Sequence, residues 1–284
     1  MAYGKKIELF LVNGTADGLV TAELSNWNGE AFKIPRIEVK SCDCKNITKA
    51  GVYFLFCKED DGTDSVYIGE SENVKDRLIQ HIHDYQADKE EYYWTTAVIF
   101  IGRDLNKTLI RYLESRLVKI ANSCRRYKIL TKNTYKNIVM KKSDRAAMEE
   151  FIDDIKVVIN ALGYKVLESL IKHDSANSTN DDDWLYINSG TAKATGKTTT
   201  EGFVVLQGTV INKNMSTQNK RIINLRDKWI LEDKVKDFVT TEDLLFSSSS
   251  AAADFVLGYS ASGPGTWKDK NGKLLKEIEA EKNE

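Results

Sequence analysis

The most regular pattern of apolar and polar positions lies between residues 51 and 85. GVYFLF (51–56) and DSVYIGE (64–70) are β-type runs, and the Asp-Gly pair between them marks a turn. The pattern therefore predicts an antiparallel hairpin in which Tyr53 and Tyr67 lie roughly opposite each other.

After the hairpin, residues 71–85 predict an amphipathic helix. Ser71 is placed to cap its start, and Arg77 and His81 fall one turn apart on a face next to the apolar one. The apolar positions recur at helical spacing and are Val74, Leu78, Ile82 and Tyr85.

The sequence then predicts a buried strand and two more helices. WTTAVIFIG (94–102) is apolar and β-branched, as in a buried strand, whereas KTLIRYLESRLVKIANS (107–123) has a helical apolar arc. Glu114 falls at the edge of that arc, where a carboxylate is poorly placed to face solvent. A further helix is expected over residues 143–164, with Ser143 as its cap.

The flanking segments predict separate units in an α+β protein. Short runs with partial two-residue alternation indicate a β-rich leader, and the polar segment HDSANSTNDDD indicates a linker. After the linker, hairpin and helix patterns follow, with helix starts near Ser216 and in the serine run 247–250. The predicted boundaries are 1–47 for the leader, 48–138 for a central domain, 139–172 for a helical extension, 173–183 for the linker, and 184–284 for an α+β C-terminal domain.

Length and composition fit a folded protein that spans no membrane. The 284 residues, 42% of them hydrophobic, can bury one large core or two smaller ones. No run of 18 or more apolar residues occurs, and the first residues lack the features of a secretory signal, so we expect a cytoplasmic protein. We expect reduced thiols, because the cysteines are few and their spacing suits neither a disulfide framework nor a zinc ribbon. The four are Cys42, Cys44, Cys57 and Cys124.

The formal net charge of −1 conceals a basic segment. Residues 102–142 contain twelve Lys or Arg residues and only two acids. Within this segment, a basic stripe interleaved with tyrosines begins with Arg125, Arg126, Lys128 and Lys132. Such a stripe fits phosphate contacts along a nucleic acid, although a charged run can equally be a solvated face.

Five features, in this order along the chain, resemble the GIY-YIG nuclease family. They are GVY (51–53), YIG (67–69), Arg77, His81, and Glu114 within YLESRL. The resemblance covers roughly residues 48–135 and implies a small, mainly antiparallel sheet flanked by helices. Segments before and after it, such as FLVNGT and EGFVVLQGT, also look like bacterial proteins in which this nuclease module precedes a domain of unknown function.

The resemblance implies a metal-dependent endonuclease that hydrolyses phosphodiester bonds in nucleic acid, DNA rather than RNA. It implies that Tyr53 takes a proton from the attacking water, for which its phenol pKa must fall from about 10 to about 7. Tyr67 and His81 would hold or relay that proton. The supporting asparagine of the family corresponds best to Asn133.

The other two side chains of the set have chemistry that fits the same reaction. Arg77 can hold a phosphate by a two-pronged contact that a lysine could not reproduce. Glu114 offers a hard oxygen ligand that could hold one Mg²⁺ or Mn²⁺, with waters and phosphate oxygens as the other ligands. Taken singly, however, Glu114 could pair with Arg111 or Lys107 along its helix.

Two other kinds of function fit the same sequence. A catalytically silent adaptor would bind nucleic acid and keep the fold without turnover, and an interaction protein would work through its C-terminal domain. The complete set of five features favours the enzyme, whereas the nearly neutral net charge favours the adaptor. Substrate preference and oligomeric state are left open.

Overall fold

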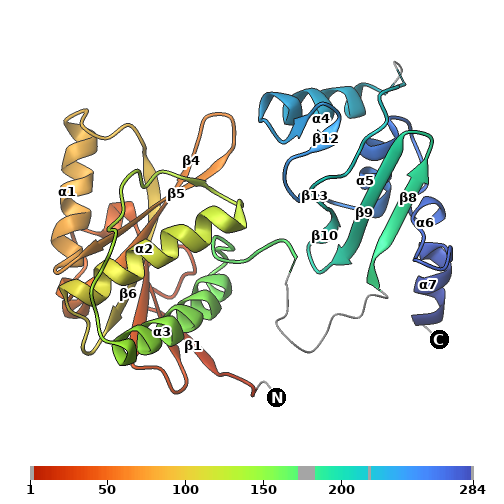
Figure 1. The fold of residues 1–284 in the computed structure, drawn as a ribbon. Coiled ribbons are helices and arrows are strands. Elements are labelled where there is room, and N and C mark those ends of the chain that lie inside the picture. Colours follow the sequence, from red (N-terminus) through yellow and green to blue (C-terminus); the bar gives the residue numbers. More distant parts are fainter. Residues whose placement is uncertain (1–2, 172–182, 217–218, 283–284) are drawn as a thin grey trace. The chain divides into compact units, whose positions relative to one another are not determined.

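The computed structural model describes residues 3–171, 183–216 and 219–282 (Figure 1). The chain divides into a first unit, Met1–Ser169, and a second unit, Leu170–Glu284. Both units contain helices and mainly antiparallel sheets, so the predicted α+β class is confirmed. The predicted linker, apart from Asp183, lies outside the described residues.

A seven-stranded sheet forms the centre of the first unit, in the order β1-β2-β3-β6-β4-β5-β7. Neighbouring strands are antiparallel except β5 and β7, which are parallel. The strands are β1 (Ile7–Leu11), β2 (Val20–Leu24), β3 (Gly29–Pro35), β4 (Gly51–Lys58), β5 (Asp64–Ser71), β6 (Trp94–Gly102) and β7 (Lys128–Ile129).

The strands of residues 1–47 continue this sheet, although the sequence pattern had set them apart as a leader. β3 pairs with β6 along its whole length, from Gly29 opposite Gly102 to Pro35 opposite Thr96. β6 is largely buried and has β4 on its other edge, so it lies inside the sheet with a neighbour on each side. Periodicity within residues 1–47 could not indicate this pairing, because the partner strand lies far along the chain.

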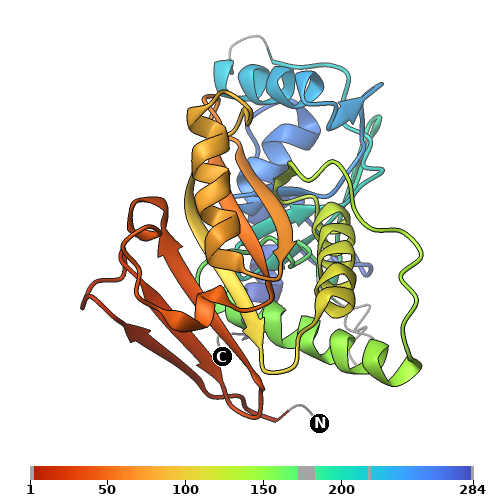
Figure 2. The same cartoon turned by 90° about the vertical axis from the view of Figure 1, so that its left-hand side faces the viewer.

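Helices cover both faces of the sheet (Figure 2). Alternate side chains of a strand point to opposite faces, so Tyr53 and Leu55 of β4 pack with α1, whereas Phe54 packs with α2 and α3. The helices are α1 (Val74–Gln86), α2 (Lys107–Cys124) and α3 (Lys142–Ala161), with 3₁₀ turns at Arg36–Glu38 and Lys45–Thr48.

Asparagine rather than serine caps the two helices that bear the predicted site. Asn73 caps α1, and Ser71 instead donates a hydrogen bond to the Asn73 carbonyl. Asn106 caps α2. Ser143 lies within the first turn of α3, because that helix begins one residue earlier. The predicted caps at Ser71 and Ser143 are therefore wrong.

The second unit contains a four-stranded antiparallel sheet, β13-β10-β9-β8, and a two-stranded sheet of β11 and β12. Ser248, within the predicted serine run, caps α5, whereas Asn219 rather than Ser216 caps α4. The strands are β8 (Leu185–Ser189), β9 (Ala192–Thr199), β10 (Gly202–Val205), β11 (Val235–Lys236), β12 (Val239–Thr240) and β13 (Leu244–Phe246). The helices are α4 (Lys220–Leu231), α5 (Ser249–Leu257), α6 (Gly263–Thr266) and α7 (Leu275–Lys282).

The cysteines and the lengths of the helices bear on two expectations from composition. The four cysteines are free, and three of them are buried. Among residues 3–171, 183–216 and 219–282, no helix is both long enough and apolar enough to span a bilayer.

Candidate active site

Tyr53 and Tyr67 lie on the same face of the β4–β5 hairpin, beneath α1. The register places Gly69 opposite Tyr53 and Leu55 opposite Tyr67, so the two tyrosines are diagonal neighbours rather than directly opposite. Their rings stack with centroids 6.2 Å apart. A Cβ atom at Gly69 would lie 2.5 Å from the Tyr53 hydroxyl oxygen, so this glycine is what lets the Tyr53 ring lie across β5.

The structure joins His81 of α1 to Tyr53. His81 is fully buried, and its Nε2 atom lies 2.9 Å from the hydroxyl oxygen of Tyr53. Its other ring nitrogen, Nδ1, lies 2.5 Å from Oε1 of Glu90, which belongs to the connection between α1 and β6. The second carboxylate oxygen of Glu90, Oε2, is buried and has no hydrogen-bond partner among the described residues. Sequence reasoning missed Glu90.

Arg36 holds the connection that carries Glu90. Its guanidinium lies over the rings of Tyr85, Tyr93 and Trp94, at 5.2, 4.6 and 4.7 Å from their centroids. These rings stand on both sides of Glu90 in the sequence, and Arg36 itself is buried. Cation–π contacts of a desolvated arginine stabilise such an arrangement.

The pKa of Tyr53 is raised. The resemblance had implied the opposite direction, because a phenol that takes a proton at neutral pH needs a lowered pKa. Burial is the main cause, the neighbouring Tyr67 adds to it, and the positive charge of Arg77 opposes it. Burial likewise raises the pKa of Tyr67, again against the effect of Arg77. Arg77, one turn before His81 on α1, therefore opposes the rise in the pKa of both phenols, but the effect of burial is larger.

Glu114 points away from solvent, as its position at the edge of the apolar arc predicted. The residue is 5% exposed, and its Oε2 atom is buried without a hydrogen-bond partner among the described residues. Burial, and secondarily the charge of Glu70, raise its pKa to about 7, against the effect of Arg111. A buried carboxylate with an unused oxygen fits a hard divalent cation such as Mg²⁺.

Among the described residues, no ion pair joins Glu114 to Lys107 or Arg111 along α2, which was the other interpretation of its position. Both cations lie near Glu70 instead. Lys107 Nζ and Arg111 Nε each lie 3.8 Å from a carboxylate oxygen of Glu70, at the end of β5. The Tyr135 hydroxyl also donates to Glu70, at 3.2 Å. Glu70 follows YIG directly in the sequence, so its position beside the motif is the signal that could have found it.

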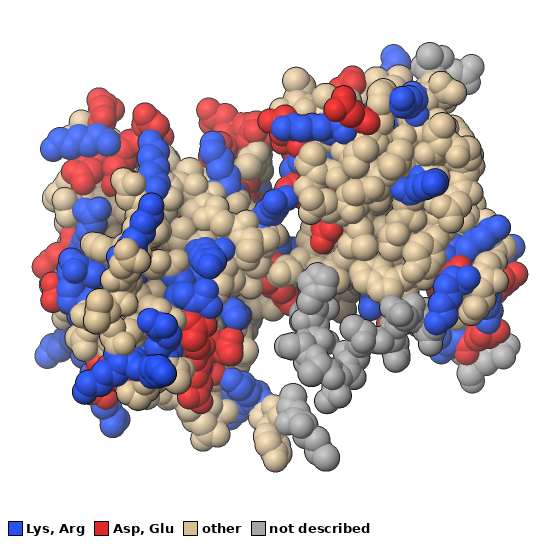
Figure 3. Space-filling view, in the orientation of Figure 1, with Lys and Arg blue, Asp and Glu red and all other residues tan. Residues whose placement is uncertain are grey.

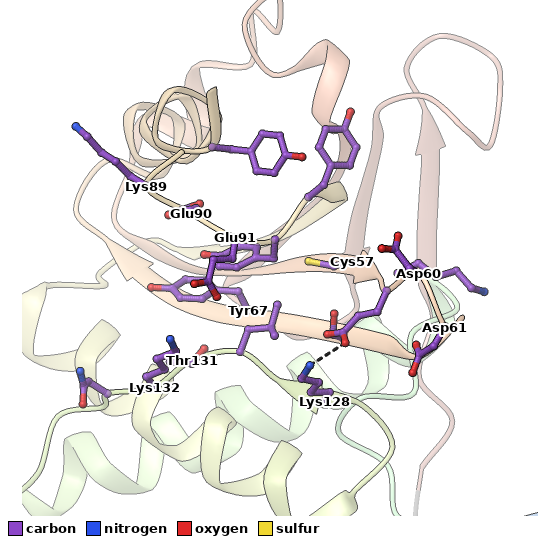
Figure 4. A pocket seen from close by; sticks show the side chains of 18 residues that line it. Cys57, Asp60, Asp61, Tyr67, Lys89, Glu90, Glu91, Lys128, Thr131 and Lys132 are labelled. Carbon is purple, nitrogen blue, oxygen red and sulfur yellow. Dashed lines mark hydrogen bonds and ion pairs between the residues drawn. The ribbon is translucent and has the colours of Figure 1, made fainter. Parts of the chain in front are cut away.

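A pocket of about 960 Å³ borders the buried cluster (Figure 4). The connection carrying Glu90 lies on one side of it and the segment from Lys128 to Lys132 on the other, with Tyr67 between them. Asn133 is exposed and lines the same pocket as Tyr67. Across residues 3–171, 183–216 and 219–282, no group of three or more His, Cys, Asp or Glu side chains is arranged to hold a metal ion.

The predicted basic stripe is partly engaged in internal contacts. Lys128 Nζ lies 2.7 Å from Glu59 Oε2, and Arg125 ends α2 in a left-handed conformation with φ 51°. Lys132 is exposed at the pocket. Figure 3 shows Lys and Arg side chains on the visible face of the first unit interspersed with acidic ones. The surface there is mixed rather than uniformly basic.

Comparison with known families places one match in the second unit. Residues 185–279 match a family described as a domain of unknown function, DUF4357, which agrees with the predicted C-terminal domain. A search of curated proteins and a search of solved structures each found no match. The resemblance of residues 48–135 to GIY-YIG nucleases therefore stays a prediction.

Proposed function

We propose that the first unit is a metal-dependent endonuclease of the GIY-YIG type that hydrolyses phosphodiester bonds in nucleic acid, DNA rather than RNA. The observation that supports this most is the buried Glu114, which has a carboxylate oxygen without a hydrogen-bond partner among the described residues. Glu114 lies in the same unit as Tyr53 and His81, which are hydrogen-bonded to each other. Ordinary folding gives no reason to leave a carboxylate in this state, because an unsatisfied buried polar atom costs about 1 to 3 kcal/mol.

Each side chain of the predicted set has a distinct role in this proposal. Arg77 is half-buried and charged, and it binds the phosphate that is cut. Glu114 holds Mg²⁺ or Mn²⁺. When bound, the cation supplies positive charge to the phosphate oxygens. Tyr67 packs against Tyr53 and His81 and faces the pocket, where Asn133 also lies.

Tyr53 receives the proton of the attacking water in this proposal. As the water oxygen bonds to phosphorus, the bond from phosphorus to the leaving oxygen breaks, and the water proton passes to the Tyr53 oxygen. The leaving oxygen departs with the bonding electron pair and takes a proton from solvent. Tyr53 in turn gives its own proton to His81, whose Nε2 atom lies 2.9 Å away. This exchange avoids a free phenolate, which the raised pKa of Tyr53 disfavours.

Nucleic acid would reach the site across the pocket and the basic residues beside it. Lys132 and Lys128 line the pocket, and Arg125 and Arg126 follow the end of α2. We place the protein in the cytoplasm, in keeping with its free thiols. A single metal site of this kind cuts one strand in each encounter, so nicked plasmid is the expected first product.

The proposal is tested by incubating the full chain with supercoiled plasmid, linear duplex, single strands and RNA, with Mg²⁺, Mn²⁺ or EDTA. Wild type should nick plasmid only with the cation. Glu114→Ala should lower the nicking rate about a thousandfold, since metal-ion stabilisation is worth several kcal/mol, and leave DNA affinity nearly unchanged.

The matched control is Glu149→Ala. Glu149 is a carboxylate of the same unit that is already paired with Arg116 and Tyr112. Its loss should leave the nicking rate nearly unchanged. Full activity of Glu114→Ala would remove the proposed metal site, and DNA binding by wild type without any cutting would favour the silent adaptor.

A further inference from the structure

We propose that Glu90 is a positioning residue of this site, which holds His81 in the tautomer whose Nε2 atom accepts the proton of Tyr53. The catalytic meaning of this inference rests on the proposed nuclease function. The hydrogen-bond arrangement itself can be measured without any catalysis.

The order of the hydrogen bonds follows from what each group can donate. An ionised carboxylate only accepts hydrogen bonds, so His81 Nδ1, 2.5 Å from Glu90 Oε1, must carry the hydrogen. In a neutral imidazole the other nitrogen, Nε2, is then an acceptor. The group facing Nε2 at 2.9 Å is the hydroxyl of Tyr53, which is therefore the donor.

Burial keeps this arrangement free from competition by water. His81 and Tyr53 are 0% and 1% exposed, and the side chain of Glu90 is 14% exposed. The titratable groups that contact His81 are Tyr53 on β4, Tyr67 on β5 and Glu90 itself. Arg77 and Glu114 act on Tyr53, and Tyr92 and Arg36 interact with Glu90.

The chain is built to place Glu90 here. After α1, Asp88 adopts a left-handed conformation with φ 53°, and the Lys89 amide donates to the Asp84 carbonyl at 2.8 Å. This turns the chain back along the helix toward His81, and Arg36 holds the aromatic rings on both sides of the turn. A loop glutamate would ordinarily remain in water, so its burial beside a histidine indicates a function for the contact.

The chemical consequence is the stabilisation of a transient charge. When Tyr53 takes a proton from water and gives its own to His81 Nε2, His81 becomes an imidazolium. The carboxylate of Glu90 then lies against that positive charge, as the third group does in a nucleophile–histidine–carboxylate triad. One proton leaves the water and one arrives at His81, so the exchange is balanced.

The arrangement is tested by nitrogen NMR of the ¹⁵N-labelled full chain without metal or nucleic acid. The chain has only 3 histidines, and His81→Gln assigns the signal. Neutral His81 of the wild type should show a protonated Nδ1 and a bare Nε2, whereas Glu90→Ala should move the proton to Nε2. A wild-type signal with the proton on Nε2 would overturn the inference.

The catalytic meaning is tested with Glu90→Gln, which keeps the shape and removes the charge. We expect kcat for plasmid nicking to fall about a hundredfold, with KM for DNA and Mn²⁺ affinity unchanged. Glu90→Asp should restore part of the rate.

Glu150→Gln is the matched control, because Glu150 is an exposed glutamate on α3 that does not line the pocket. It should cut like wild type. A wild-type kcat in Glu90→Gln would overturn the positioning role. If wild type itself does not cut, the nuclease proposal fails, while the NMR result still decides whether Glu90 sets the tautomer.

Discussion

Arg226 in the second unit and Glu114 in the first are both buried charged residues, with very different surroundings. Arg226 donates to the backbone carbonyls of Phe255 and Val256 near the C-terminus of α5, and to that of Asn212. Burial lowers its pKa to about 10, so it stays charged at neutral pH. Glu114 has an oxygen without any hydrogen bond among the described residues, beside the like charge of Glu70.

The comparison separates two uses of buried polarity. A cation at a helix C-terminus satisfies carbonyls that the helix leaves without donors, so Arg226 stabilises the fold. Glu114 gains nothing of the kind and makes folding less favourable when ionised. The unused oxygen of Glu114 is therefore open to the cation that we propose, whereas the satisfied Arg226 stabilises the fold.

The largest effect that would sharpen this contrast is expected for Tyr53→Phe. Loss of the hydroxyl should slow nicking about a thousandfold, within the range known for general acid–base groups. It should also lower the free energy of unfolding by about 1 to 3 kcal/mol, because the buried Nε2 atom of His81 loses its hydrogen-bond partner. Nicking rates and urea unfolding measure the two quantities. Tyr186→Phe in the second unit is the control, and a wild-type rate for Tyr53→Phe would exclude the proposed proton acceptor.

The opposite pattern is expected for Arg226→Met. Removing the guanidinium leaves three backbone carbonyls without this donor and should lower the free energy of unfolding by about 3 kcal/mol. The nicking rate of the folded protein should not change. Arg221→Met, an exposed arginine on the same helix, is the control for urea unfolding. An equally small stability loss in both variants would contradict the structural role of Arg226.

A smaller effect, of opposite sign, is expected for Glu114→Gln. Because the folded-state pKa of Glu114 is raised from 4.5 to about 7, wild type loses stability as the pH rises from about 4.5 to 7. The glutamine variant lacks this loss and should be more stable by about 2 kcal/mol at pH 8 but not at pH 4.5. Urea unfolding at both pH values measures the difference, and a difference independent of pH would count against the raised pKa.

Local patterns in the sequence predicted much of the first unit. The helix expected over residues 107–123 is observed as Lys107–Cys124, and the hairpin and the strand 94–102 form where the apolar runs stand. Errors occurred where a single residue was weighed, as in the caps at Ser71 and Ser143. Several side chains near a helix end can serve as a cap, and local sequence does not decide between them.

The sequence by itself determined which side chains share a face: Arg77 with His81, one turn apart, and Glu114 turned from solvent. Tertiary structure alone placed Glu90 against His81, Glu70 beside Glu114, and Arg36 among aromatic rings. It also decided the sign of the Tyr53 pKa shift. Short-range order follows from the repeat of a helix or strand, which is written in neighbouring residues. Contacts between loops and distant segments, and the burial that sets a pKa, exist only once the whole unit has packed.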